Sequence, residues 1–449
     1  MEDIGRPPSI GRNAFRHAVA LRAGKAIGRL VAPPQMNTPP LFKRILTAWV
    51  LLAGSSVGAE NWPQFRGPRG DGVSQETNVP TRWSRTENIR WKTAIPGEGH
   101  SSPIVWGDTV LLTSAEKSSG QRILLRLDAN TGKILWQVTV LTAPAEAMHR
   151  ENNLASSTPV TDGIHVFTSF QAGNRADLRC FDFNGKQVWS SQPLAFDGEH
   201  GYSYSPILHG DRLFFDCRQE GEAALLALDK RTGKIVWRAE PGRKRISHAP
   251  PLIIGEGART QLVVCGTDEI RSFNPDTGQP IWWCAGPSEV GVAGLSFGDG
   301  LLFAASGYPT KTRLAVRVDG RGDVTGSHIA WSLRRQVPYV PSPVFFEGHL
   351  YTVDDGGMLY CFDAKTGEPT WEKRVGGRVR SSLVLAAGRI YSTNEKGVTT
   401  VFAADPKAYR EVATNTLGEF SYTTPAISGG RLFMRAGGNL YCIGAGGAQ

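Results

Sequence analysis

Six polar side chains stand at or near the short apolar segments that open successive parts of the chain, where they could converge on one ligand. Imidazole, amide, phenol and guanidinium groups bind ligands through hydrogen bonds, and arginine adds a permanent positive charge. Asn152 and Tyr202 are weaker candidates of the same kind. The sequence leaves open whether the six meet at one site or are separate surface residues with ordinary hydrogen bonds. The six candidates are His100, Asn153, Tyr204, His248, Tyr339 and Arg380.

Covalent and metal chemistry find little support in the sequence. No two of the six cysteines are adjacent, no Cys-x-x-Cys-His occurs, and the paired short spacings of metal sites are missing. There is no Gly-x-Ser-x-Gly in a strand-to-helix context, no phosphate loop and no evident pair of carboxylates for general acid and base roles. We therefore expect no catalytic residue and no metal site. The cysteines are expected to be buried free thiols, with one disulfide left open as a possibility: Cys180, Cys217, Cys265, Cys284, Cys361 and Cys442.

A recurring hairpin motif must position these candidates. Residues Asp229–Trp237 read DKRTGKIVW, and closely related stretches recur along the chain. The Asp can accept hydrogen bonds from turn amides, and the Gly can adopt the positive φ that the turn needs. The apolar residues before the Trp suit a half-buried strand. The other copies are Asp128–Trp136, Asp182–Trp189 (one residue shorter), Asn274–Trp282, Asp363–Trp371 and the longer Asp319–Trp331, whose turn is Thr325-Gly326.

The spacing of the closing tryptophans predicts the architecture. Successive tryptophans are 40 to 53 residues apart, which is typical of four short strands per unit in a β-propeller. We expect their rings to lie in the outer strands and to wedge between adjacent blades. The turn residues that recur in the repeat are Asp128, Asp182, Asp229, Asp363, Gly132, Gly185, Gly233, Gly278 and Gly367. The tryptophans are Trp91, Trp136, Trp189, Trp237, Trp282, Trp331 and Trp371.

Eight segments resembling Ser-Pro-Ile-Val at Ser102 open the units, so an all-β, eight-bladed propeller is predicted. The last unit has only three strands, and the strand at 88–95 around Trp91 has no preceding partner. We predict that it completes the C-terminal blade and leaves no open edge. Seven blades remain the alternative, because the seventh unit lacks Thr-Gly and has Val412 at roughly the Trp position.

Charge and hydropathy indicate an exported protein. Residues 1–59 carry a net charge of +6 and the remainder only +3, so no basic stripe supports nucleic-acid binding. A signal peptide is predicted over residues 36–59, starting at Met36. It has a basic pair at Lys43-Arg44, an apolar run over Ile45–Leu52 and a small-residue cleavage site before Glu60. The apolar run is too short to be a membrane anchor. Residues 1–35 are interpreted as a mis-assigned start or an extension, 60–87 as an extended lead-in that docks on the propeller surface, and 88–445 as the propeller. We expect a monomer, periplasmic or extracellular, without a transmembrane span once processed.

The motif Asp-x-x-Thr-Gly-x-x-x-Trp, with a small residue such as Ala227 or Cys361 two places before the Asp, resembles the repeat of the PQQ-like (pyrroloquinoline-quinone-like) propellers. The resemblance covers about residues 61–443. The lead-in WPQFRGPRGDGVS, with GHSSPIVWGD and VPYVPSP, is similar to that of secreted bacterial PQQ-like repeat proteins. This superfamily includes quinoprotein alcohol dehydrogenases and the non-enzymatic propeller BamB. Adjacent cysteines beneath the cofactor, which the resemblance would imply for a quinoprotein dehydrogenase, are missing here.

We therefore expect a non-catalytic binding or scaffold module, similar to BamB in the cell envelope, whose partner is an envelope protein or polymer. No cofactor is expected. The alternative is an oxidoreductase of the quinoprotein type, binding PQQ with Ca²⁺ in the central funnel. A carbohydrate-cleaving propeller is a third possibility. The repeat predicts the fold more firmly than the chemistry, because sites are grafted onto folds.

Overall fold

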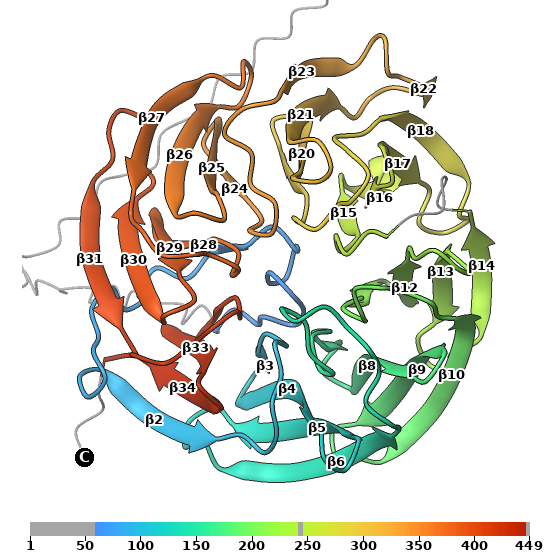
Figure 1. The fold of residues 1–449 in the computed structure, drawn as a ribbon, viewed down its shortest axis with the longest axis vertical. Coiled ribbons are helices and arrows are strands. Elements are labelled where there is room, and N and C mark those ends of the chain that lie inside the picture. Colours follow the sequence, from blue (N-terminus) through green and yellow to red (C-terminus); the bar gives the residue numbers. More distant parts are fainter. Residues whose placement is uncertain (1–58, 241–245, 446–449) are drawn as a thin grey trace, which may run out of the picture. The chain divides into compact units, whose positions relative to one another are not determined.

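The computed structural model describes residues 59–240 and 246–445, which belong to one compact unit. Eight sheets of at least four strands each are arranged in a ring, so the predicted eight-bladed β-propeller is confirmed and the seven-bladed alternative is wrong (Figure 1). The predicted extension (1–35) and signal peptide (36–59, apart from its last residue) lie outside the described residues. None of the described residues lies in a helix long and apolar enough to cross a membrane.

Each blade runs from an inner strand at the central channel to an outer strand at the rim. The inner strands of blades 1 to 8 are β3 (Ile104–Trp106), β7 (Val160–Thr161), β11 (Ile207–His209), β15 (Leu252–Ile254), β19 (Ser296–Gly298), β24 (Val344–Phe346), β28 (Val384–Ala386) and β32 (Ala426–Ser428). The second strands are β4 (Thr109–Glu116), β8 (His165–Ala172), β12 (Arg212–Cys217), β16 (Gln261–Gly266), β20 (Leu301–Ser306), β25 (His349–Val353), β29 (Arg389–Thr393) and β33 (Arg431–Ala436).

The outer half of each blade completes the antiparallel sheet. The third strands are β5 (Gln121–Asp128), β9 (Arg175–Asp182), β13 (Ala224–Asp229), β17 (Glu269–Phe273), β21 (Thr312–Arg317), β26 (Met358–Asp363), β30 (Val398–Ala403) and β34 (Asn439–Ile443). The outer strands are β6 (Ile134–Thr142), β10 (Gln187–Ala195), β14 (Ile235–Ala239), β18 (Pro280–Ala285), β23 (Ile329–Leu333), β27 (Pro369–Arg374), β31 (Glu411–Thr416) and, in blade 8, β2 (Ile89–Ala94).

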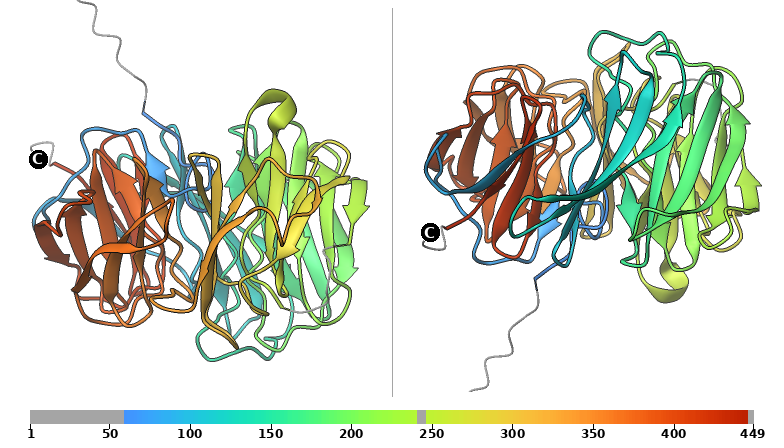
Figure 2. Two further views of the ribbon diagram at one scale, coloured as in Figure 1. Left: turned by 90° about the horizontal axis from the view of Figure 1, so that it is seen from above. Right: turned by 90° about the horizontal axis from the view of Figure 1, so that it is seen from below.

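Three further short elements are added to this plan. Strand β1 (Val73–Ser74) pairs in parallel with β28, and β22 (Gly322–Asp323) pairs in parallel with the outer strand β18. The single described helical turn, η1 (Gly257–Arg259), lies between β15 and β16 and projects from one side of the ring in Figure 2. We call one side of the ring the turn face. It carries the turns between the first and second strands of each blade, such as Gly107-Asp108 between β3 and β4, and the Thr-Gly turns. The opposite side, with the connections between blades, is the mouth face.

The ring closes where the N-terminal strand joins the C-terminal blade. Strand β2 pairs antiparallel with β34, and Trp91 lies opposite Cys442 while Lys92 lies opposite Tyr441. Figure 1 shows β2 at the start of the chain beside β34 at its end. The prediction that the strand around Trp91 completes the last blade is therefore confirmed, and no described blade leaves its third strand unpaired.

Tryptophan rings seal the contacts between blades. At six of the seven closing tryptophans, the indole Nε1 donates to a backbone carbonyl of the next blade over 2.8–3.0 Å, as Trp189 does to Lys230. The turn Gly of that next blade lies directly on the same ring: a Cβ on Gly132 would stand 2.5 Å from the Trp91 ring. Gly185, Gly233, Gly278 and Gly367 approach the rings of Trp136, Trp189, Trp237 and Trp331 in the same way. Glycine is therefore required both for the positive φ and for close approach.

The aspartate of the repeat orders its own turn. Asp229 Oδ1 accepts hydrogen bonds from the N–H groups of Arg231 and Thr232 and from the Thr232 hydroxyl, at 2.9–3.1 Å. Asp128 and Asp363 make the corresponding bonds. Because the carboxylate satisfies amides that a tight turn leaves unpaired, the turn keeps the shape that fits the neighbouring indole ring.

Two units depart from the repeat. Trp282 donates to Gln261 Oε1 of its own blade at 2.8 Å, and Gln261 Nε2 in turn donates to Val318 O of blade 5. The longer turn of blade 5 forms β22, which pairs with β18, and its Val324 packs in the same buried cluster as Trp282. In blade 7 the residue in register with the tryptophans is Ala413, opposite Val401, so the prediction of Val412 at this place is wrong by one residue. A β-bulge precedes Ala413, just as one precedes the closing tryptophans of other blades, which supports this register.

The lead-in was predicted to dock on the propeller surface, but part of it lies buried against the blades. Trp62 pairs with Val105 of blade 1, Thr161 N of blade 2 donates to Pro63 O, and β1 joins blade 7. The Arg66 guanidinium, 1% exposed, donates to Leu295 O of blade 5 and to Pro343 O of blade 6. Glu76 also accepts hydrogen bonds from Gly429 N and Gly430 N of blade 8, so the lead-in crosses the turn face of the channel and contacts at least six of the eight blades.

All six cysteines are buried and free, as expected, and no disulfide is formed among them. Cys180, Cys361 and Cys442 lie at the third-strand position opposite a closing Trp, where Ala227 also lies. Burial raises the pKa of the Cys180, Cys265, Cys284 and Cys442 thiols to about 12, which keeps them protonated and poorly reactive.

We predict that Gly132→Ala destabilises the protein by about 1–3 kcal/mol more than Gly107→Ala. Both glycines have a positive φ, +73° and +54°, so both substitutions carry the left-handed backbone cost of about 1–2 kcal/mol. Only the Cβ at 132 collides with an indole ring, whereas nothing lies within 4 Å of the one at 107. Urea unfolding of both variants measures the difference. Equal free energies of unfolding would show that the ring contact is not tight.

Candidate functional site

A cavity of about 150 Å³ lies at the centre of the ring, between the lead-in and the mouth face. Phe65 of the lead-in forms part of its lining together with residues from the approach to the inner strands of several blades. His100, His248, Arg380 and Tyr422 supply the larger polar and aromatic side chains. The cavity is therefore the inner part of a channel whose opposite end is closed by the lead-in.

A ring of hydroxyl groups lines this cavity. In each blade of the series, one residue shortly before the inner strand donates its backbone N–H to the hydroxyl of the equivalent residue in the next blade. The donor–acceptor distances are 2.8–3.1 Å. The series stops at blade 4, where Pro250 offers no hydroxyl. Blades are thus joined at the channel as well as at the rim. In order, the donors and acceptors run Gly294, Ser342, Ser382, Thr424, Ser102, Thr158 and Ser205.

Three of the six predicted residues line the central cavity: His100, His248 and Arg380. His248 Nδ1 is 2.8 Å from Ser203 Oγ, and its ring centroid is 5.4 Å from that of Tyr204. The His100 ring lies edge-on to Tyr422, with centroids 4.9 Å apart. These residues come from blades 1, 4 and 7, so the channel does bring distant parts of the sequence together.

The other three have different surroundings. Tyr204 is 4% exposed, packs with Phe196, Tyr202 and Phe215, and its hydroxyl donates to Arg218 O. Asn153 Oδ1 accepts from Ala155 N at 2.9 Å and from His100 N at 3.3 Å, which fixes the loop before blade 2.

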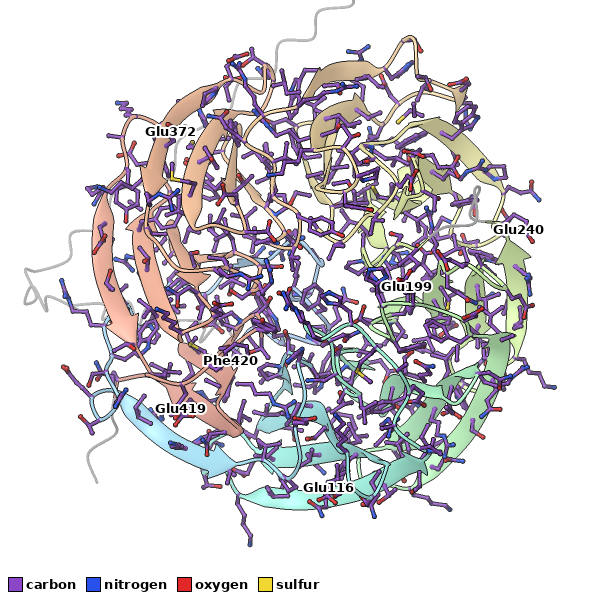
Figure 3. The ribbon with its side chains drawn as sticks, in the orientation of Figure 1. Glu116, Glu199, Glu240, Glu372, Glu419 and Phe420 are labelled. Carbon is purple, nitrogen blue, oxygen red and sulfur yellow. The ribbon has the colours of Figure 1, made fainter. Side chains whose placement is uncertain are left out.

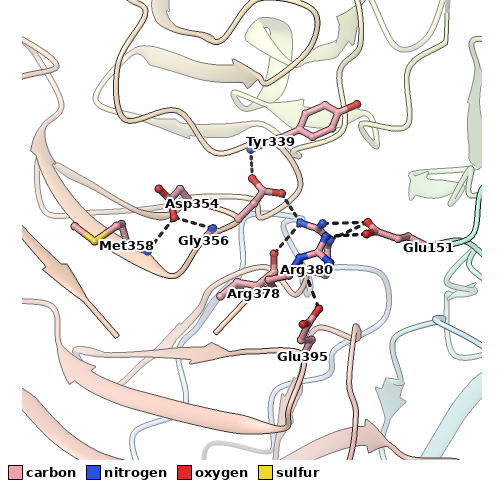
Figure 4. Close-up of polar contacts among 10 residues, drawn as sticks. Glu151, Tyr339, Asp354, Gly356, Met358, Arg378, Arg380 and Glu395 are labelled. Carbon is pink, nitrogen blue, oxygen red and sulfur yellow. Dashed lines mark hydrogen bonds and ion pairs between the residues drawn. The ribbon is translucent and has the colours of Figure 1, made fainter. Parts of the chain in front are cut away.

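Tyr339 is held through its backbone, because its N–H donates to Asp355 Oδ2 at 2.8 Å. Figure 4 shows its ring pointing away from Arg380. Of the weaker candidates, Tyr202 is buried with Tyr204, and Asn152 Nδ2 donates to His200 O at 2.9 Å.

An ion-pair cluster bridges the mouth of the channel. Glu151, on the connection between blades 1 and 2, reaches Arg378 Nη2 at 2.7 Å and Arg380 Nη2 at 3.0 Å, both on the approach to blade 7 (Figure 4). Arg380 Nη1 also lies 2.6 Å from Asp355 Oδ1 of blade 6. Burial would raise the pKa of Glu151, but the hydrogen bonds and charges of the two arginines outweigh it and hold that pKa below its ordinary value. The bridge is therefore ionised at neutral pH.

The two cavity histidines are neutral at physiological pH. Burial, with a smaller effect of the Arg435 charge, lowers the pKa of His100 to about 4. Burial, followed by the charge of His200, lowers the pKa of His248 to about 4. Neutral imidazoles among hydroxyl groups can exchange hydrogen bonds with a polar ligand but do not supply a positive charge.

Several residues around the channel escaped sequence reasoning. The hydroxyl ring could have been found, because Ser or Thr recurs before Pro at the start of most units. Phe65 and Glu151 belong to no repeated motif, and they reach the channel only because the lead-in and one connection fold over it. Tyr422 lies two residues before Thr424 of the ring, a position that has no constant residue type in the other blades.

The matches to known families lie in the repeat region of the chain. A sequence model described as outer membrane protein assembly factor BamB matches residues 73–175, 174–304 and 266–408. BamB of Burkholderia pseudomallei is 24% identical over 290 residues, 63% of this chain and 58% of that protein. The 1-butanol dehydrogenase (quinone) of Thauera butanivorans is 26% identical over 215 residues, 44% of this chain and 32% of that protein. The chain thus aligns with less than two thirds of the length of either relative.

Solved structures show the same fold. BamB from Moraxella catarrhalis has a TM-score of 0.56 at 17% identity, covering 79% of this chain and 97% of that one. A europium-containing methanol dehydrogenase has a TM-score of 0.61 at 12% identity, covering 82% and 87%. At these identities the likeness concerns the fold alone.

The central cavity does not fit a quinone held by Ca²⁺. Its volume of about 150 Å³ is below the roughly 300–1,000 Å³ of ordinary ligand pockets. Calcium prefers six to eight oxygen ligands, chiefly carboxylates and carbonyls, yet none of the lining residues is an Asp or Glu. Within residues 59–240 and 246–445, no group of three or more His, Cys, Asp and Glu is arranged to hold a metal ion.

We predict that His248→Gln weakens the dependence of stability on pH between about 6.5 and 5. The folded pKa of His248 is depressed, so on acidification the unfolded chain takes up a proton that the folded chain refuses. The free energy of unfolding should then fall with decreasing pH, by up to about 1.4 kcal/mol per unit for each such histidine. Glutamine can retain a hydrogen bond to Ser203 but does not titrate.

Urea unfolding at several pH values measures this slope. The exposed His209, changed to Gln, is the matched control and should leave the slope unaltered. Identical slopes for His248→Gln and the unchanged protein would contradict the assignment of a neutral, buried imidazole.

Proposed function

The chain belongs to the family of PQQ-like repeat propellers whose sequence model is described as outer membrane protein assembly factor BamB, and from this membership we propose that it is a non-catalytic binding or scaffold module of the cell envelope. The partner we favour is an envelope protein bound on the mouth face. An envelope polymer is the other partner of this class. The predicted signal peptide over 36–59 and the name of the BamB relatives support the location.

The observation that carries this proposal is the closure of the channel from both sides. The lead-in with Phe65 and Arg66 closes the turn face, and the Glu151 bridge to Arg378 and Arg380 crosses the mouth. What remains inside is small and has no paired carboxylates. A molecule with this construction offers its surface, more than its interior, to a partner.

The rim of the mouth has the side chains that protein interfaces use. Tyr308, in the β20–β21 turn, is 58% exposed, and Arg378, on the approach to blade 7, is half exposed. Tyrosine, phenylalanine and arginine are enriched at interfaces because they bury a large area while retaining polar groups for pairing. The rigid blades would present these residues with little loss of conformational freedom on binding.

We predict that Tyr308→Ser reduces capture of an envelope protein by at least about tenfold, since a buried interface tyrosine often contributes 1–2 kcal/mol or more. The measurement is photo-crosslinking of the purified protein, with the crosslinker on the mouth face, to solubilised envelope proteins. Ile164→Ser is the matched control: Ile164 is 67% exposed but lies in the β7–β8 turn on the turn face. Equal loss in both variants, or no loss in either, would refute a partner on the mouth face.

The rival function is a quinone-dependent oxidoreductase, supported by the alignment with 1-butanol dehydrogenase (quinone). We expect that incubation with pyrroloquinoline quinone and Ca²⁺, followed by gel filtration, leaves no bound chromophore and no alcohol-dependent dye reduction. The cavity is too small and lacks carboxylates. A retained chromophore together with dye reduction would replace the scaffold proposal with an enzymatic one, whatever the result of the crosslinking.

A further inference from the structure

A second cavity, of about 190 Å³, lies on the mouth face at the contact between blades 8 and 1. Three segments form it: 98–100 before blade 1, 420–423 before blade 8, and 435–438 at the β33–β34 turn, with Asn153 beside them. It shares His100 and Tyr422 with the central cavity, so the two are neighbours, but Glu98, Asn153, Phe420 and Arg435 line the seam pocket alone. We call it the seam pocket.

An aromatic shelf forms one wall of the seam pocket. Phe420 and Tyr422 have ring centroids 4.5 Å apart, and the His100 ring follows at 4.9 Å from Tyr422. Figure 3 labels Phe420 beside the strands of blade 8. Leaving half of a phenylalanine in water is unfavourable for the free protein, because apolar surface is more stable away from water. We therefore expect the shelf to bind a ligand that has an apolar face.

The backbone beneath the shelf is fixed. Ser421 Oγ and Thr423 Oγ1 both donate to Arg435 O, at 2.8 and 2.9 Å, and Gly437 N donates to Phe420 O at 2.8 Å. The exposure of Phe420 is consequently a property of an ordered segment. Such a rigid shelf can bind without first being ordered.

Planar polar groups form the opposite part of the pocket. The Arg435 guanidinium is buried and donates to Thr113 O and Ser114 Oγ, at 2.8 and 3.2 Å, but makes no ion pair with any described carboxylate. Burial lowers its pKa to about 10, so it stays charged. The exposed Glu98 carboxylate and the amide N–H₂ of the half-buried Asn153 make no hydrogen bond within the described part of the chain, so both are open to water or to a ligand. Donors and acceptors are thus both available in one pocket.

The charges and shapes of these groups select the ligand class. Arg435 and Glu98 carry opposite charges, so the pocket favours an uncharged ligand over an ion. Carboxylate, amide and guanidinium groups can each pair with adjacent hydroxyl groups. An uncharged molecule with an apolar face on one side and hydroxyl groups at its edge is a saccharide ring.

We propose that the seam pocket binds an uncharged saccharide unit, with its apolar face on Phe420 and Tyr422 and its hydroxyl groups on Glu98, Asn153 and Arg435. This goes beyond the scaffold function, which needs no small-ligand site. Arg435 also joins blade 8 to blade 1 through its bonds to Thr113 and Ser114. That structural role explains why Arg435 is present, but it does not explain the exposed ring of Phe420 beside it.

The test is ligand-observed NMR titration of the full exported chain with three probes: maltose, N,N′-diacetylchitobiose and digalacturonate. At least one of the two uncharged disaccharides should bind with a dissociation constant of about 1 mM or below, and the charged one more weakly. Phe420→Ala should weaken binding by roughly 2- to 12-fold, as expected for loss of an aromatic stacking contact. Glu98→Gln, which keeps the shape but loses the charge, should weaken it by about tenfold or more.

Tyr308→Ala is the matched control, an exposed aromatic on the same face outside the seam pocket, and it should leave saccharide binding unchanged. The proposal is overturned if neither uncharged disaccharide binds below about 10 mM, if digalacturonate binds best, or if Phe420→Ala binds as the unchanged protein does. Partner capture depends on Tyr308 and saccharide binding on Phe420, so failure of either proposal is visible independently of the other.

Discussion

The contact between an indole ring and the turn of the next blade is the interaction on which the whole ring depends. Five of the seven closing tryptophans make two contacts at once, a hydrogen bond to a backbone carbonyl and a ring face against a glycine. Both require the turn to keep one shape, which the Asp or Asn at its start secures. Strand, turn and ring are therefore specified together, and the repeat can tolerate wide variation elsewhere.

A second set of contacts between blades lies at the channel, in addition to the tryptophan contacts at the rim. The hydroxyl ring joins the inner strands, and the lead-in adds bonds from its backbone and from Arg66 and Glu76 to at least six blades. Blades of a propeller would otherwise meet mainly through side-chain packing, with each blade contacting only its neighbours. The lead-in contacts blades that are not neighbours, and so it restrains the ring as a whole.

The sequence predicted the fold well because the repeat is a local signal. The spacing of Trp91 to Trp371, the Ser-Pro segments and the incomplete last unit were sufficient for eight blades and for their closure by β2. The register of blade 7 was missed by one residue, since a unit that has neither Trp nor Thr-Gly offers no marker from which the position can be counted.

The site was less predictable, because its residues belong to connections. His100, His248 and Arg380 could be placed at the channel from their position before inner strands. Tyr204 follows the same rule but turns into the core, where Phe196 and Phe215 surround it. Glu151 and Phe65 reach the channel through the path of irregular segments, and no periodicity in the sequence encodes that path.

Closure of blade 8 by an N-terminal strand has a consequence for how the chain can be made. Arg90 donates to the carbonyl of Ala445, 355 positions further along, so the outer strand of this blade and its other three strands are synthesised far apart in time. Until the final segment emerges, the Trp91 strand has no third strand with which to pair. A nascent chain would therefore expose an unpaired strand edge for almost the whole of its synthesis. Such an exposed edge is a binding site for a chaperone that holds unfolded chains.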